Sequence, residues 1–229
     1  MSTVQSGNRE RPGAGPRRTQ ASALHAGHAG RLMVLRAAAL FDGVSPALMA
    51  RPSVVIADGV IAAVHGPAEV FPTDAHVVDL SGLTLMPGLV DAHLHLSFDA
   101  SSDPVGHLER ADDDTLRQRM ADAARRALRA GVTTVRDLGD RNYLAVDLRD
   151  RDSAGQAGPL PTIVAAGPPI TTPGGHCHFL GGAASGERGL RAAVQDRAER
   201  GVDVIKVMAS GGNMAPGSLR TSRSSAPRR

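Results

Sequence analysis

The chain has 229 residues, of which 41% are hydrophobic and only 2% aromatic, so aliphatic side chains have to build its core. Residues 1–31 carry five arginines and one glutamate and residues 217–229 carry four arginines and no acid, so the net charge of +3 becomes about −5 on residues 32–216. This distribution does not support nucleic-acid binding by the folded part. No apolar run reaches the roughly 18 residues of a membrane-spanning helix, so no membrane association is expected.

The first 30 residues are predicted to be a disordered tail. They are polar, rich in Gly, Pro and Arg, and lack the apolar segment of a signal peptide. The single cysteine, Cys177, excludes an internal disulfide framework and is typical of a reducing compartment. We therefore predict a cytoplasmic protein.

Residues 31–88 contain short β-rich runs separated by turn signals. The runs are LMVLRAAALF, SVVIADG, GVIAAVH, HVVDL and LTLMP, and Asp58-Gly59 marks a hairpin. Such a meander predicts a small sheet or a β-sandwich segment.

After residue 88 the pattern changes to strands that alternate with helices, which predicts an α/β fold of βαβ units with a parallel sheet. The expected strands are residues 89–98, 132–139, 161–170 and 202–210. The expected helices are residues 104–130, 143–148 and 187–200.

The stretch DAHLH, with Asp91, His93 and His95, belongs to the first strand of this series. Because alternate residues of a strand point to the same face, both imidazoles should project together. Two imidazoles on one strand supply half of a divalent-metal site, and catalytic groups of β/α barrels lie at the carboxyl ends of strands. The alternative is two histidines on a polar strand face.

The run VDVIKVMAS contains Lys206, the only lysine of the chain. A parallel strand is buried on both faces, so this amine should be shielded from water, and a shielded lysine loses affinity for its proton. A neutral amine can form a Schiff base, act as a base, or react with carbon dioxide to give a carbamate, an anionic oxygen ligand able to bridge two metal ions. The alternative is a side chain that reaches solvent at a strand end.

The segment TTPGGHCHFLGG, residues 171–182, is predicted to be a glycine-rich loop whose backbone can approach a ligand closely. His176 and His178 are candidate substrate contacts, and the alternative is a surface loop with incidental histidines. The loop that begins at Ser210 has the same character. Cys177 has no assignable base, so it is not predicted to be a nucleophile.

Taken together, GLTLMPGLVDAHLHL, GVTTVRDLG, GGHCHFLGG and DVIKVMASGG, preceded by VVIADGVIAAV, resemble the amidohydrolase superfamily. The motifs GGHCHFLGG and DVIKVMASGG are most similar to its imidazolonepropionase-related and prolidase-like branch. The resemblance covers roughly residues 31–216. It implies that residues 89–216 form strands 1–4, the first half of a (β/α)8 TIM-type barrel, after a β-sandwich segment at residues 31–88.

The resemblance also implies a metal-dependent hydrolase that breaks amide, lactam or dipeptide-like C–N bonds with a metal-bound hydroxide. Its cofactor would be a divalent metal, commonly zinc, with two ions in the complete family site. By position, His93, His95 and Lys206 match metal ligands, Lys206 as a carbamylated bridge, and His176 matches a substrate-binding histidine. No catalytic base is assigned, because the family aspartate ends strand eight.

The pattern stops soon after the fourth expected strand, so we expect a C-terminally truncated member. Residues 217–229 form a basic, Ser-rich tail. With suitable codons, the same DNA read in another frame would encode the start of a helix, so the tail is interpreted as the product of a frameshift. The first alternative function is therefore a catalytically incomplete remnant, and the second is an arginine-tailed module for acidic partners. The expected partner is a small-molecule amide substrate, and homo-oligomer formation is left open.

Overall fold

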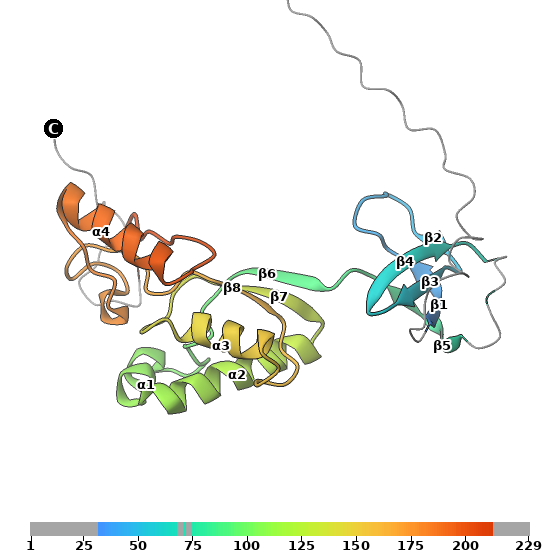
Figure 1. The fold of residues 1–229 in the computed structure, drawn as a ribbon, viewed down its shortest axis with the longest axis horizontal. Helices are drawn as coiled ribbons and strands as arrows, with labels where there is room; N and C mark the ends of the chain where they lie inside the picture. The colour runs from blue at the N-terminus through green and yellow to red at the C-terminus, as the bar shows by residue number, and fades with distance from the viewer. Residues whose placement is uncertain (1–31, 68–70, 72–74, 213–229) are drawn as a thin grey trace, which may run out of the picture. The chain divides into compact units, whose positions relative to one another are not determined.

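The computed structural model describes residues 32–67, 71 and 75–212, and the chain divides into two compact units after Pro87 (Figure 1). The tails predicted at residues 1–30 and 217–229 lie outside the described residues.

The first unit contains one five-stranded sheet. The strands are β1 (Met33–Leu40), β2 (Met49–Ala50), β3 (Ser53–Ala57), β4 (Val60–His65) and β5 (His76–Leu85), and they pair in the order β2-β1-β3-β4 with β5 also on β1. The hairpin predicted at Asp58-Gly59 is confirmed: both residues have positive φ, 52° and 78°, which is the backbone of a type I′ turn. Buried valines, among them Val34 and Val55, form the core of this unit.

The prediction of a simple meander was wrong for the last strand of this sheet. β5 pairs with β1 in parallel, whereas β2 and β3 pair with β1 antiparallel. The two runs expected as separate strands, HVVDL and LTLMP, are one strand, because a register shift between Ala37 and Ala39 takes up the extra residues as a bulge. The pattern of apolar residues is the same for parallel and antiparallel pairing, so the sequence could not distinguish them.

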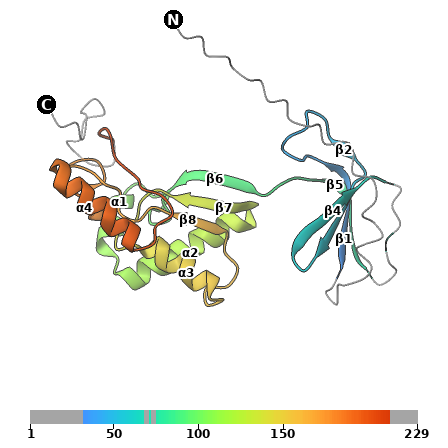
Figure 2. The same ribbon diagram turned by 45° about the horizontal axis from the view of Figure 1, so that its top comes forward.

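The second unit has a parallel sheet in the order β6 (Leu89–Leu94), β7 (Val132–Asp137) and β8 (Thr162–Ala165). Its helices are α1 (Pro104–Arg110), α2 (Asp113–Arg129), α3 (Leu144–Ser153) and α4 (Gly186–Glu199), with a 3-10 turn at His178–Leu180. This alternation confirms the predicted βαβ units and the mixed α/β class. Both ribbon views show α2 and α3 on one face of the sheet, with no described helix on the other face (Figures 1 and 2).

The helix expected over residues 104–130 is in fact two helices. Ala111 ends α1 in an extended conformation, and Asp112 begins α2 by accepting a 2.7 Å hydrogen bond from the backbone N–H of Thr115. An aspartate that satisfies a free N–H in this way is a strong helix start. The periodic apolar residues continue across the break, so the helical pattern alone did not reveal it.

The fourth expected strand, residues 202–210, is an extended segment and not a regular strand, and it includes a parallel bridge between Val207 and Ile170. The N–H of Ile170 donates to the carbonyl of Lys206, and the N–H of Met208 donates to the carbonyl of Ile170, both at 2.8 Å. A regular ladder to β8 is interrupted because Pro168 and Pro169 have no N–H to donate. The segment nevertheless runs beside the continuation of β8.

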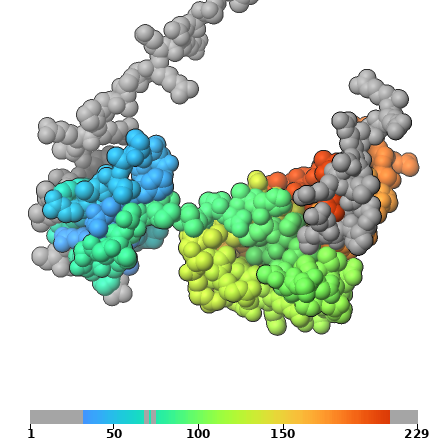
Figure 3. Space-filling model, turned by 180° about the vertical axis from the view of Figure 1, so that it is seen from behind, coloured from blue at the N-terminus to red at the C-terminus, as the bar shows by residue number. Residues whose placement is uncertain are grey.

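One core holds the second unit together, and it lies between the sheet and the helices. The α2 side chains Leu116, Met120 and Ala124 are fully buried, as is Val135 of β7. α2 and α3 also pack against each other. The space-filling view from behind shows the light green and yellow-green atoms of α1 and α2 on the same side of the second unit (Figure 3). Among the described residues, no helix is both long and apolar enough to span a membrane.

Candidate metal centre

His93 and His95 lie together at the carboxyl end of β6, as the strand alternation predicted. Their ring centroids are 5.7 Å apart. The strand ends at Leu94, so His95 stands just beyond it, and His95 is half-buried whereas His93 is exposed. Burial and the nearby charge of Lys206 lower the pKa of both imidazoles. Both rings therefore favour the neutral form, which is the form that binds metals.

The orientation of the His95 ring is fixed by the backbone of a neighbouring loop. Its Nδ1 lies 2.8 Å from the carbonyl oxygen of Gly139, and because a carbonyl can only accept, Nδ1 carries the proton. The lone pair is then on Nε2, the nitrogen left for a ligand. A side chain at position 139 would crowd the ring, since a Cβ on Gly139 would lie 3.1 Å from His95 Cε1.

Lys206 lies beside these histidines. Its positive charge contributes to the lowered pKa of His93, His95 and His176, so four of the predicted site residues share one region. The expectation of full burial was wrong, because the side chain is half-buried. The physical reason is the edge position of residues 202–210, which the described chain covers on the β8 side alone.

The loop after β8 brings His176 to the same region. Among the described residues, its Nδ1 is buried without a hydrogen-bond partner. The ring packs on the backbone of Gly212, where an added Cβ would lie 2.4 Å from His176 Cε1. His178, the other candidate contact of this loop, is exposed, and its Nδ1 lies 3.0 Å from the Gly175 carbonyl oxygen. Burial raises the pKa of Cys177 to about 11, so its thiol stays protonated and is a poor nucleophile.

Two buried aspartates support the site, and the sequence analysis did not single them out. Asp137, at the end of β7, accepts hydrogen bonds from the backbone N–H groups of Leu96 (2.8 Å) and Gly139 (2.9 Å). It thereby holds in place the residue after His95 and the loop that bonds His95. The signal available was an aspartate at the carboxyl end of a parallel strand in VTTVRDLGD.

Asp140, three residues on, is buried as completely as Asp137. One of its oxygens accepts from the N–H of Ala145 at the start of α3, and the other has no partner among the described residues. Burial raises the pKa of Asp137 to about 7, and burial together with the charge of Asp137 raises the pKa of Asp140 well above its usual range. Burial therefore favours the protonated form of Asp140.

The described residues contain no cluster of three or more His, Cys, Asp or Glu side chains able to hold a metal ion. The structure therefore gathers three imidazoles, those of His93, His95 and His176, and one lysine. The lysine does not count as a ligand in its ammonium form, because an ammonium group has no lone pair to offer.

Comparison with known proteins places this arrangement in a family. The profile of the Amidohydrolase family matches residues 84–221, which is more than half of the chain. The chain belongs to the amidohydrolase family. The enamidase of Eubacterium barkeri is 34% identical to this amidohydrolase over 112 residues, which are 48% of this chain and 25% of the enamidase.

Solved structures give the same result. A Xaa-Pro dipeptidase with bound methionine in its active site superposes with a TM-score of 0.71 at 28% identity, over 79% of this chain and 48% of that chain. A prolidase complexed with N-methylphosphonate-L-proline superposes with a TM-score of 0.74 at 26% identity, over 85% of this chain and 50% of that chain. This amidohydrolase thus spans about half the length of the solved relatives it matches, and a quarter of the enamidase.

Proposed function

We propose that this chain carries the first part of the metal centre of a hydrolase that breaks amide, lactam or dipeptide-like C–N bonds. The observation that supports it most is the convergence of His93, His95 and Lys206 in a chain of the amidohydrolase family. We further propose that β6, β7, β8 and residues 202–210 are strands 1–4 of a (β/α)8 barrel. A parallel sheet with helices on one face alone is consistent with this, because the inner face of a barrel carries no helices.

The donor chemistry fits a divalent metal such as zinc. Neutral imidazoles are common zinc ligands, and His95 has its Nδ1 engaged by Gly139, which leaves Nε2 for the metal. When bound, such a metal polarises a carbonyl and lowers the pKa of water. With two imidazoles and one modified lysine, the described part of the chain supplies ligands for little more than one ion.

The role of Lys206 depends on its charge. As an ammonium group it raises the cost of a cation beside His93 and His95, just as it disfavours their protonation. The ammonium group first loses a proton, and the neutral amine then reacts with carbon dioxide, which forms an N–C bond and releases a second proton. The positive charge is thereby replaced by a negative one. We propose that Lys206 acts as this carbamate, because an arginine at the same position could not be modified in this way.

His176 is proposed to contact the substrate. Its Nδ1 has no partner among the described residues, and it faces the region of His95 and Lys206 from the loop after β8. The solved relatives include a Xaa-Pro dipeptidase and a prolidase with a proline-based inhibitor. Dipeptides that end in proline are therefore the first substrates to test, with small lactams second.

The test is zinc retention and hydrolysis by the full chain. We expect the purified chain, incubated with zinc and bicarbonate and then dialysed, to retain zinc, and the His93→Ala and His95→Ala variants to lose most of it. Loss of a residue that only supports a metal ligand typically lowers metal affinity by about 10–100-fold, and loss of the ligand itself removes a bond to the metal. His76→Ala, which changes an exposed histidine of the first unit, is the matched control.

Hydrolysis is measured on the same samples with a panel of Xaa-Pro dipeptides. Turnover that depends on zinc and on His93 supports the complete proposal. Zinc binding without turnover favours the second candidate, a catalytically incomplete chain, which the absence of a three-residue ligand cluster in the described part supports. Zinc retention equal in the wild type and both histidine variants would refute the metal centre itself.

A further inference from the structure

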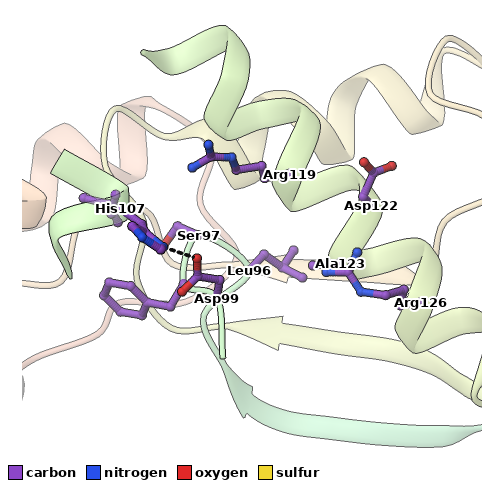
Figure 4. A pocket seen from close by; sticks show the side chains of 10 residues that line it. Leu96, Ser97, Asp99, His107, Arg119, Asp122, Ala123 and Arg126 are labelled. Carbon is purple, nitrogen blue, oxygen red and sulfur yellow. Dashed lines mark hydrogen bonds and ion pairs between the residues drawn. The ribbon is translucent and has the colours of Figure 1, made fainter. Parts of the chain in front are cut away.

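A pocket lies on the second unit, and neither His93 nor Lys206 lines it. It has a volume of about 140 Å³ and is formed by the segment after β6, by α1 and by one face of α2 (Figure 4). This volume is several times that of a water molecule, so a small group of atoms fits inside. Nothing in the proposed hydrolysis uses this pocket.

Ser97 contributes an unsatisfied polar group to its wall. The residue is 6% exposed, and its hydroxyl has no hydrogen-bond partner among the described residues. A buried hydroxyl without a partner is destabilising, and native structures usually pair such groups. A ligand in the pocket would supply the missing acceptor.

Two arginines of α2 make the pocket electropositive. Arg119 and Arg126 both line it, and no hydrogen bond or ion pair engages either guanidinium within the described residues. They lie seven residues apart, two turns along one helix face, and Figure 4 shows Arg119 extended from α2 toward the segment that carries Ser97.

The acidic residues of the lining are already engaged by other groups. Asp99 pairs with His107 at 2.7 Å, drawn as a dashed line in Figure 4, and it also accepts from Ser101. Asp122 pairs with Arg125 at 2.8 Å. When Arg125 is included, three guanidinium groups stand against two carboxylates, so the net charge around the pocket is positive, which suits an anion.

We propose that this pocket binds a small oxyanion, a phosphate or carboxylate group, through Arg119, Arg126 and the Ser97 hydroxyl. Guanidinium groups hydrogen-bond such oxygens with a geometry that matches them, and a hydroxyl adds a third donor. The site is close to the candidate metal centre, since Phe98 lines the pocket and its ring centroid lies 5.3 Å from that of His95. The proposal does not depend on the hydrolytic activity.

The test is calorimetric titration of the full chain with inorganic phosphate and, separately, with acetate, at constant ionic strength. We expect one saturable site for at least one of the two anions, and the stronger of them identifies the preferred source of the group. Arg119→Gln and Arg126→Gln should each weaken binding about tenfold, as expected for the loss of a charged hydrogen bond. Arg129→Gln on the same helix, outside the pocket, should bind like the wild type.

Ser97→Ala separates a ligand site from a packing defect. Removal of an unpartnered buried hydroxyl should leave the melting temperature unchanged or raise it, while the affinity for the anion falls. The proposal is overturned if neither anion binds at millimolar concentration. It is also overturned if the affinities of the Ser97→Ala and Arg119→Gln variants equal that of the wild type, because binding would then be elsewhere on the chain.

Discussion

The Asp137→Asn substitution should destabilise the folded chain at low pH and stabilise it at high pH. The wild-type carboxyl is fully buried with a pKa of about 7, against 3.8 for its ordinary value. Between these two values the unfolded chain loses this proton while the folded chain keeps it, so wild-type stability falls as pH increases. A difference of about three pKa units corresponds to a loss on the order of 4 kcal/mol across this range.

The asparagine of the variant does not titrate. The variant is destabilised instead by the loss of a hydrogen bond. The asparagine carbonyl can accept from Leu96 or from Gly139, but its NH2 group cannot, so one buried N–H loses its partner. This costs about 1–3 kcal/mol at every pH. The variant should therefore be less stable than the wild type at pH 4.5 and more stable at pH 8. Removal of the Asp137 charge also lowers the pKa of Asp140, which acts in the same direction.

The assay is urea unfolding of the full chain at both pH values, followed by helical circular dichroism, because all helices of the described chain lie in the second unit. Asp150→Asn is the matched control, since that aspartate is exposed on α3 and is solvated in both states. A stability difference between wild type and Asp137→Asn that stays constant from pH 4.5 to 8 would refute the reasoning.

Three further substitutions and one control, Gly174→Ala, test the packing that positions the site, each by urea unfolding. Gly167→Ala should lower the free energy of unfolding by about 1–3 kcal/mol, because Gly167 has φ +63° and an added Cβ would lie 2.6 Å from the Tyr143 ring. Gly174→Ala should lower it by less, because Gly174 has φ +69° but no neighbour within 4 Å of an added Cβ. Met120→Ala, at a fully buried position of α2, should cost about 2–5 kcal/mol. Asp112→Ala should cost about 0.5–2 kcal/mol through loss of the α2 cap. Equal costs for the two glycine variants, or a Met120→Ala variant as stable as the wild type, would contradict the packing described.

Local patterns made much of the fold predictable. The alternation of strands with amphipathic helices after residue 88 gave the order of the second unit, and Asp58-Gly59 gave the hairpin, because both depend on neighbours in sequence. The parallel pairing of β5 with β1 and the interrupted ladder at residues 202–210 were not predicted, since they depend on which distant segments meet.

The candidate site was predictable to the same degree. His93 lies in β6 and His95 directly follows its last residue, so their proximity could be predicted from strand alternation. The half-burial of Lys206 depends instead on the neighbours of an edge segment. Asp137 and Asp140 are ordinary surface residue types in a sequence, and only the tertiary fold makes them buried acids. Their contacts with the backbone around His95 were therefore beyond sequence reasoning.

The most direct test of the metal centre uses the fact that the chain has a single lysine. Full-length protein is incubated with zinc and ¹³C-labelled bicarbonate, and the carbamate carbon is observed by NMR. We predict a carbamate signal that strengthens with zinc and is absent in Lys206→Arg, which retains the N-terminal amine as an internal control. A spectrum without a zinc-dependent carbamate signal, or with the same signal in Lys206→Arg, would contradict the assignment of Lys206 as a metal ligand.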